Sequence, residues 1–234
     1  MVLGRLVNGE RKITNPRPEN AGKLLIFCEG HTEYNYLDYF RSYIDNNLRA
    51  KYSDIVIEPI NTEGNAMHVF YFAEEFLRVG ENASKYLHYE KHLVFDCDAP
   101  ENIQTVIGMM KESENEYILD YSNLLFETWL VMHFQNLEPD TDYSKRVIYK
   151  LMRDYLNVTR YTKKMKASKG TIGKILGSNG NERIRAAIEN AKLLEKHWED
   201  AGKDMGKNIT QMNPSVEIYK LIERLLDEVV YLCG

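Results

Sequence analysis

Hydrophobic and polar positions along residues 23–136 predict short strands that alternate with helices. Four apolar runs have the length of a buried strand, at residues 24–28, 54–60, 91–96 and 116–122. Each run is followed by apolar residues three or four positions apart, which is the spacing of one helical face. The predicted helices cover residues 32–48, 66–79, 100–113 and 123–134. This alternation is typical of an α/β fold with a mostly parallel sheet and helices on both faces.

Residues 137–234 show helical spacing and no strand pattern. The predicted helices of this half cover residues 143–156, 181–199 and 214–232. Asn213 is the expected cap of the last helix, with Pro214 at its first position, and Thr32 is the expected cap of the first helix of the chain. We therefore expect a helical extension that packs on the α/β domain of residues 23–136.

The overall charge allows only a local contact with nucleic acid. The 234 residues include 44% hydrophobic residues and carry a net charge of −5, which argues against attraction of nucleic acid to the whole surface. Residues 1–22 are basic, contain few apolar residues and are predicted to form an irregular arm. This arm either contacts nucleic acid or is an ordinary chain terminus.

Cysteine content and hydropathy indicate the compartment. The three cysteines lack a metal-binding spacing, which argues against a disulfide framework and a structural zinc and fits a reducing cytoplasm. No apolar run approaches the ~20 residues that span a bilayer. We therefore expect a soluble cytoplasmic protein without a membrane partner.

Acidic residues follow two of the predicted strands. Glu29 comes directly after the first strand, and Asp96 and Asp98 stand at the end of the third. Parallel strands joined by right-handed crossovers end at one edge of the sheet, so we expect these carboxylates to lie close together. Converging carboxylates repel one another, and Mg²⁺ or Mn²⁺ would relieve that repulsion. A single Asp-x-Asp motif is also common at helix caps and in loops. The metal site is therefore predicted from the combination of Asp96 and Asp98 at one strand end with Glu29 at another.

Two further features suit an anionic substrate. Gly30 allows a sharp turn and a close approach of phosphate to the backbone, and the helix that follows points its N-terminus at the same edge. A later stretch contains six basic residues and no acid: Arg160, Lys163, Lys164, Lys166, Lys169 and Lys174. This stretch is either a phosphate-binding patch or a loose, solvated loop around Gly170.

Several short motifs resemble a known family. The segment EGHTE at residues 29–33, together with Asp96 and Asp98, looks like the Toprim domain of topoisomerases, primases and OLD-type nucleases. The segment SNLLFETWL at residues 122–130, followed by His133 and Phe134, is similar to the corresponding segment of the RloB-like family. The stretches YTK at 161–163 and NPS at 213–215 extend this resemblance over about residues 23–230.

The resemblance implies a fold, an activity and partners. It implies a Toprim, Rossmann-like fold of the OLD and abortive-infection type and a nuclease that depends on Mg²⁺ or Mn²⁺ and cuts DNA or RNA. Relatives of this kind are found beside restriction systems and next to genes for ABC-type ATPases, and some act in phage defence by abortive infection. A homodimer is a further expectation.

The resemblance also implies roles for individual residues. Glu29 would be a metal ligand and the general base, Asp96 and Asp98 would be metal ligands, and Glu127 would be a further acid near the metal. Lys163 matches the Tyr-x-Lys of the family and would contact phosphate or stabilise the transition state. The remaining expected site residues would support the ligands or bind phosphate: Gly30, Thr32, Glu33 and Lys164. Glu33 could also be an ordinary first-turn acid.

The chain departs from the family pattern at three places. Leu124 and Leu125 replace Pro-Cys, and Val216 replaces Thr. Ala99 follows Asp98 where the family tends to have another acid, which puts a second metal ion in question. Two other functions stay open. One is an Asp-x-Asp-dependent nucleotidyl or sugar transferase, which would leave Glu29 without a metal role. The other is a catalytically weak effector or regulatory partner of an ATPase.

Overall fold

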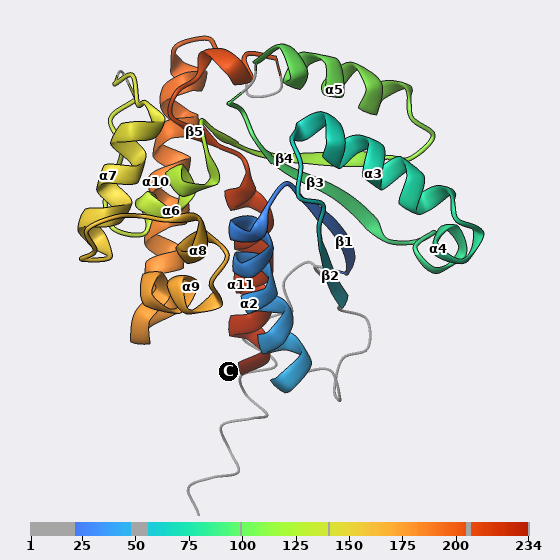
Figure 1. Cartoon of the computed structure of the whole chain (residues 1–234), viewed down its shortest axis with the longest axis horizontal. Coiled ribbons are helices and arrows are strands. Elements are labelled where there is room, and N and C mark those ends of the chain that lie inside the picture. The colour runs from blue at the N-terminus through green and yellow to red at the C-terminus, as the bar shows by residue number, and fades with distance from the viewer. Residues whose placement is uncertain (1–21, 48–55, 99, 140, 205–206, 234) are drawn as a thin grey trace, which may run out of the picture.

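The centre of the fold is a mostly parallel sheet, as predicted, with five strands where four were expected. The computed structural model describes residues 22–47, 56–98, 100–139, 141–204 and 207–233, so nearly all of the predicted basic arm lies outside the described residues. Its strands are β1 (Lys23–Cys28), β2 (Val56–Asn61), β3 (Glu90–Asp96), β4 (Tyr117–Asn123) and β5 (Ser215–Val216). They lie in the order β2-β1-β3-β4-β5, and only β5 is antiparallel to its neighbour (Figure 1).

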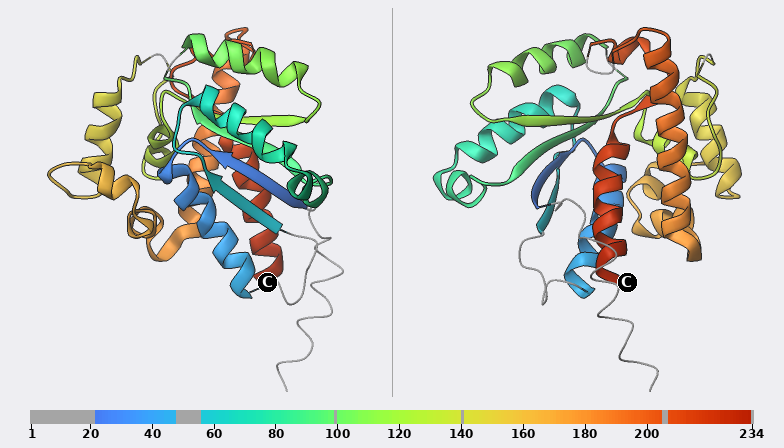
Figure 2. Two further views of the ribbon diagram at one scale, coloured as in Figure 1. Left: turned by 45° about the vertical axis from the view of Figure 1, so that its right-hand side comes forward. Right: turned by 180° about the vertical axis from the view of Figure 1, so that it is seen from behind.

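Helices cover both faces of the sheet (Figure 2). One face packs against α3 (Ala66–Arg78) and α5 (Pro100–Glu112), and the short α4 (Gly80–Lys85) follows α3. The opposite face packs against a larger group of helices: α2 (His31–Asn47), α6 (Phe126–Met132), α7 (Lys145–Tyr155), α9 (Lys169–Leu176), α10 (Gly180–Asp200) and α11 (Ile218–Cys233). The helix α8 (Lys163–Lys166) lies between α7 and α9, and 3₁₀ turns cover Gly177–Asn179 and Ile209–Gln211.

Strand β1 shows why the sequence reads as a continuous apolar run. Leu24 and Ile26 belong to the apolar cluster on one face of the sheet, whereas Leu25 and Phe27 belong to the cluster on the other face. All four side chains are fully buried. A strand covered on both faces needs apolar residues at every position, which is the usual pattern of a parallel sheet between two helical layers.

The region before the last helix differs from the prediction. Ser215 and Val216 form β5, pairing with Asn123 and Ser122 of β4, so the predicted absence of a strand in this half is wrong. The helix therefore begins at Ile218, and neither Asn213 nor Pro214 starts it; the peptide bond between them is cis. Val216, which replaces the Thr of the family pattern, is buried and pairs with Ser122 in the sheet.

Three other local predictions also need correction. Helix α2 begins at His31, so Thr32 lies inside it and does not cap it. The lysine-rich stretch around Gly170 forms α8 and α9 and is no loose loop, and the side chain of Thr162 caps α8 by accepting a hydrogen bond from the Met165 N–H. The helix expected at 123–134 covers only Phe126–Met132, because Asn123 belongs to β4. None of the described helices combines the length and apolar character that a membrane crossing requires.

Candidate functional site

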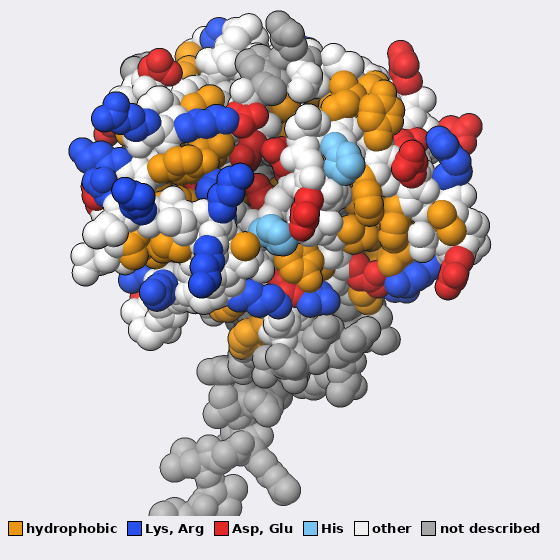
Figure 3. All heavy atoms as spheres, in the orientation of Figure 1, with side chains coloured by type: hydrophobic (Ala, Val, Ile, Leu, Met, Phe, Trp, Pro, Cys, Tyr) orange, Lys and Arg blue, Asp and Glu red, His pale blue; other side chains and the backbone are white. Residues whose placement is uncertain are grey.

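A pocket of about 640 Å³ opens at the edge where the parallel strands end. Figure 3 shows the acidic side chains gathered in the hollow at the centre of this face. Every acid that the sequence assigned to the site lines this pocket, although the acids come from three separate parts of the chain. The lining residues are Glu29, Gly30, His31, Thr32, Glu33, Glu63, Gly64, Asp96, Asp98, Glu127, Lys163, Lys166 and Ala167.

Backbone hydrogen bonds hold the first two acids together. The Glu29 N–H donates to the carbonyl of Val94 at 2.9 Å, which ties the end of β1 to β3. The Oε2 of Glu29 accepts a hydrogen bond from the Asp96 N–H at 3.0 Å. Asp96 in turn accepts from the N–H of Phe126, the first residue of α6, at 2.6 Å. The ends of β1 and β3 and the start of α6 are therefore linked through carboxylates.

Glu33 and Glu127 lie deeper in the pocket. Glu33 is in the first turn of α2 and is 5% exposed, and Glu127 is on α6 and is 1% exposed. A Cβ on Gly30 would lie 3.3 Å from the Oε2 of Glu33, tighter than most contacts of this kind. The glycine thus leaves room for the Glu33 carboxylate beside the backbone.

The acids share a strongly unfavourable electrostatic environment. Burial raises the pKa of Glu29 to about 7, against the lowering effect of the Asp96 N–H. Burial, together with the charges of Glu127 and Glu29, raises the pKa of Glu33 to about 8. Burial and the charges of the neighbouring glutamates raise the pKa of Asp96 well above its usual range. Such a cluster is one that a bound cation would stabilise.

Two lysines partly neutralise the acids: Lys166, which was predicted only as a member of the basic stretch, and Lys145, which was not predicted. The Nζ of Lys166 lies 2.8 Å from Oε1 of Glu127 and donates to the hydroxyl of Tyr149 at 2.7 Å. Lys145, at the start of α7, forms an ion pair with Asp98. A signal existed for Lys166, because it stands three residues after Lys163 in a capped helical turn. No pattern in the sequence distinguishes Lys145, whose partner is 47 positions away.

The other predicted site residues divide into two groups. Thr32 is buried and lines the pocket, and Lys163 lines it as an exposed side chain on the rim. Lys164 is exposed and is not among the lining residues. The cations nearest the acids are therefore Lys145 and Lys166, and Lys163 stands at the entrance.

The donor set suits a hard divalent cation. The five lining acids that were predicted from the sequence provide oxygen ligands of the kind that Mg²⁺ and Mn²⁺ prefer. Within the part of the chain that the structure describes, no three acidic, histidine or cysteine side chains are already arranged around one ion position. The Phe126 N–H donates a hydrogen bond to Asp96, and Lys145 forms an ion pair with Asp98. A bound ion would therefore compete with Lys145 for Asp98.

The opposite rim of the pocket is formed by the loop between β2 and α3. His31 reaches across to this loop: its Nε2 lies 3.0 Å from Glu63, and its Nδ1 lies 3.1 Å from the side-chain nitrogen of Asn61. Glu63 adopts a left-handed backbone conformation, with φ of 55°. His31 and Glu63 were not assigned a role in the site from the sequence, although His31 stands only two residues after Glu29.

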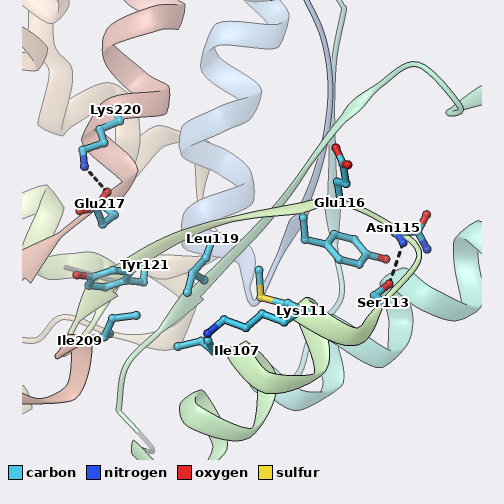
Figure 4. Close-up of a pocket in the computed structure, with 12 residues that line it drawn as sticks. Ile107, Lys111, Ser113, Asn115, Glu116, Leu119, Tyr121, Ile209, Glu217 and Lys220 are labelled. Carbon is cyan, nitrogen blue, oxygen red and sulfur yellow. Dashed lines mark hydrogen bonds and ion pairs between the residues drawn. The ribbon is translucent and has the colours of Figure 1, made fainter. Parts of the chain in front are cut away.

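A second pocket, of about 570 Å³, lies between α5, β4 and the start of α11 (Figure 4). Its wall includes Tyr117, Tyr121 and Lys220, and Lys220 is paired with Glu217 at 2.8 Å. None of the predicted site residues lines this pocket. The acid-lined pocket at the strand ends is therefore the candidate site.

Comparison with known proteins identifies a family. The family model described as RloB-like protein matches residues 24–225, which is most of the chain. The match extends from β1 into α11 and so includes all the residues that line the acid-lined pocket. No curated protein and no solved structure matches the chain.

Proposed function

The chain belongs to the RloB-like protein family, and from this premise we propose that it is a nuclease that hydrolyses phosphodiester bonds with the help of Mg²⁺ or Mn²⁺. The observation that carries the proposal is the convergence of Glu29, Asp96 and Asp98 in one pocket at the strand ends. A transferase that uses Asp96 and Asp98 alone would leave Glu29 without a role. The hydrogen bond from the Asp96 N–H to Glu29 instead makes Glu29 part of the same group of acids.

The residues of the pocket suit a hydrolytic reaction. Glu29, Asp96 and Asp98 would hold the ion, with Glu127 nearby, and a bound Mg²⁺ or Mn²⁺ supplies charge neutralisation and a more acidic water. Glu29 would accept a proton from the attacking water, which is the role that the family resemblance implies for it. Water attacks the phosphorus, the bond to the leaving oxygen breaks, and Glu29 takes the proton. Lys163 at the rim binds a phosphate oxygen of the substrate.

The direct test is cleavage of labelled DNA and RNA by the purified chain with Mg²⁺, with Mn²⁺ and with EDTA. We expect Glu29→Gln and Asp96→Asn to lower the rate at least about 100-fold, which is the usual range for loss of a general base or a charge-stabilising group. Both variants should keep the far-UV circular dichroism of the parent chain. Glu199→Gln, which changes an exposed acid on α10, is the matched control. Equal cleavage rates for Glu29→Gln and the parent would reject the mechanism.

The family resemblance also supports a place in phage defence beside an ABC-type ATPase. Co-expression with an ABC-type ATPase encoded near the gene should give co-purification, and phage should form fewer plaques on cells that express both proteins than on cells that express either one alone. Binding to the ATPase without cleavage under any metal condition would favour the alternative, an effector or regulatory partner.

A further inference from the structure

We propose that the pocket accepts a single strand of nucleic acid, with its phosphates over α7–α9 and its bases against α3. This inference rests on the proposed nuclease function and specifies its substrate. Two independent features of the surface carry it: basic residues gather on one side of the pocket and Glu63 stands on the opposite rim, and a row of rings lies on the side of Glu63.

The basic side is the surface formed by α7, α8 and α9. Residues 145–176 contain ten Lys and Arg residues and a single acid, Asp154. Figure 3 shows a dense group of basic side chains on this side of the acid-lined hollow. Exposed cations without an ion-pair partner among the described residues are Arg146, Lys150, Arg160, Lys163, Lys164 and Lys174. This surface suits one phosphate backbone, because phosphate contacts supply most of the non-specific affinity for nucleic acid.

The opposite side has the reverse charge. Residues 56–77, which form β2, the loop between β2 and α3, and most of α3, contain four acids and no Lys or Arg. Glu58 is paired with Lys85 of α4, so the acid of this range that acts at the pocket is Glu63. Glu63 stands on the pocket rim with 67% of its side chain exposed. The two backbones of a duplex lie about 6–12 Å apart across its grooves, a distance comparable with the ~8–10 Å Debye length at physiological salt. If a duplex occupied the pocket, the acidic rim would therefore repel the phosphates of its second strand.

A row of rings occupies this acidic side. His68, Phe72 and Phe76 stand four residues apart on α3, and their ring centroids are 6.4 and 6.2 Å apart along the row. His68 is exposed, and the two phenylalanines are half-buried. Phe72 and Phe76 also pack against Phe27, and the solvent-facing part of the row offers a stacking surface for unpaired bases, because every base has an aromatic face. The bases of a duplex are already stacked and paired, so they would gain little from it.

The row begins at the pocket itself. The Nε2 of His68 lies 3.1 Å from the carbonyl of Thr62, in the rim loop. A Cβ on Gly64, which lines the pocket, would lie only 2.3 Å from the ring of His68, so the two are in contact. A strand whose phosphate enters between Lys163 and Glu29 would thus have the ring row beside its next bases.

The first experiment measures binding in EDTA, so that cleavage does not interfere. Fluorescence anisotropy of a labelled 20-nucleotide strand of DNA, the same strand of RNA, and the DNA duplex is followed with the full chain. We expect one or both single strands to bind at least tenfold more tightly than the duplex. Duplex binding as tight as that of the single strands would overturn the inference.

A second experiment separates stacking from charge. We expect Phe72→Leu, which keeps an apolar side chain, to weaken single-strand binding about tenfold, as loss of one base–aromatic contact does. Tyr71→Leu is the matched control, because Tyr71 is a neighbouring ring on α3 that is 52% exposed and stands outside the row. If Phe72→Leu does not fold, His68→Ala makes the same test at an exposed position. Equal effects of the row variant and Tyr71→Leu would overturn the placement of the bases.

The third experiment tests whether replacing the acid on the rim with a cation improves binding of the duplex. Glu63→Lys should tighten binding of the duplex several-fold and reduce the preference for a single strand, whereas Glu81→Lys on α4 should change neither. No gain in duplex binding with Glu63→Lys would contradict the proposed role of the acidic side. These binding experiments and the cleavage assay test the two proposals separately. If the chain prefers a single strand but cleaves nothing, only the nuclease proposal is rejected. If it cleaves nucleic acid but prefers a duplex, only the single-strand inference is rejected.

Discussion

Glu127 and Lys166 form the most buried ion pair of the pocket. The carboxylate side chain is 2% exposed and the lysine side chain is 27% exposed, so neither group is well screened by water. Burial lowers the pKa of Lys166, but the charge of Glu127 and its hydrogen bonds outweigh burial and raise the pKa above its ordinary value. Lys166 therefore stays charged at neutral pH and balances part of the acid cluster.

Loss of that cation should destabilise the fold. We expect Lys166→Met to lower the free energy of unfolding by about 3 kcal/mol at pH 7, because it leaves Glu127 buried without a partner. Urea denaturation measures the change. The double variant Lys166→Met with Glu127→Gln should recover part of the loss, whereas Lys164→Met, at the exposed neighbouring position, should change stability by less than about 0.5 kcal/mol. No difference between the two lysine variants would show that the pair is neutral for stability.

Individual site residues differ in how far sequence reasoning could place them. Glu29, Asp96 and Asp98 could be predicted, because the rule that parallel strands end at one edge converts strand ends into neighbours. Lys145 could not be predicted, because its contact with Asp98 depends on how a helix from the second half of the chain packs on the sheet. The same holds for Glu63, whose contact with His31 depends on the path of the rim loop.

At the scale of elements, the pattern of burial explains which predictions were confirmed. The long strands and helices have strong apolar periodicity, and they match the structure within a few residues. β5 has only two residues, so no periodicity could reveal it, and it exists because the end of β4 offers free hydrogen-bonding groups. The helices α8 and α9 are short and rich in lysine and glycine, so composition favoured a loop over the helices that form.

Strands β3 and β4 carry a buried charged group at the end away from the pocket. His92 on β3 lies 2.6 Å from Asp120 on β4 and 2.7 Å from Glu90, and Arg224 of α11 also pairs with Glu90. Burial lowers the pKa of His92, but the charge of Asp120 and the hydrogen bonds with both acids outweigh it and raise the pKa to about 9. The imidazolium thus links two strands and a helix.

This group predicts a pH dependence of stability. The pKa of His92 is about 6.5 in an unfolded chain, so its stabilising contribution is complete below that pH and is lost as the pH rises through 9. We expect the stability difference between the parent and His92→Gln to shrink by about 3 kcal/mol between pH 6 and pH 9.5. Urea denaturation at both pH values measures it, with the exposed His88→Gln as control. A difference independent of pH would mean that His92 is neutral in the folded chain.

At the scale of the whole molecule, the helical half and the sheet share one core. The larger apolar cluster includes Leu24 and Ile26 of the sheet together with Ile148, Ile188 and Leu225 of the later helices. The helices that bring the cations to the pocket are therefore held on the same face of the sheet as α2 and α6. This arrangement places basic groups from the second half of the chain over acids from the first half.

That arrangement sets up a competition at the edge of the sheet. Lys145 of α7 pairs with Asp98, and the two side chains are 50% and 31% exposed, so the pair is accessible to ions from solution. We expect Lys145→Gln to tighten the binding of Mn²⁺ by about two- to fivefold, the factor that corresponds to a partly exposed ion pair of ~0.5–1 kcal/mol. Isothermal titration calorimetry on the full chain measures it.

Two comparisons make this prediction specific. Lys150→Gln changes an exposed cation further along α7 that forms no ion pair with Asp98, and it should leave Mn²⁺ affinity within about 1.5-fold. Asp98→Asn should weaken Mn²⁺ binding, and adding Lys145→Gln to it should bring no further gain, because the lysine would have no ligand left to release. If Lys145→Gln weakens Mn²⁺ binding instead, the lysine positions Asp98 for the ion, and the helical half would complete the site and not compete with it.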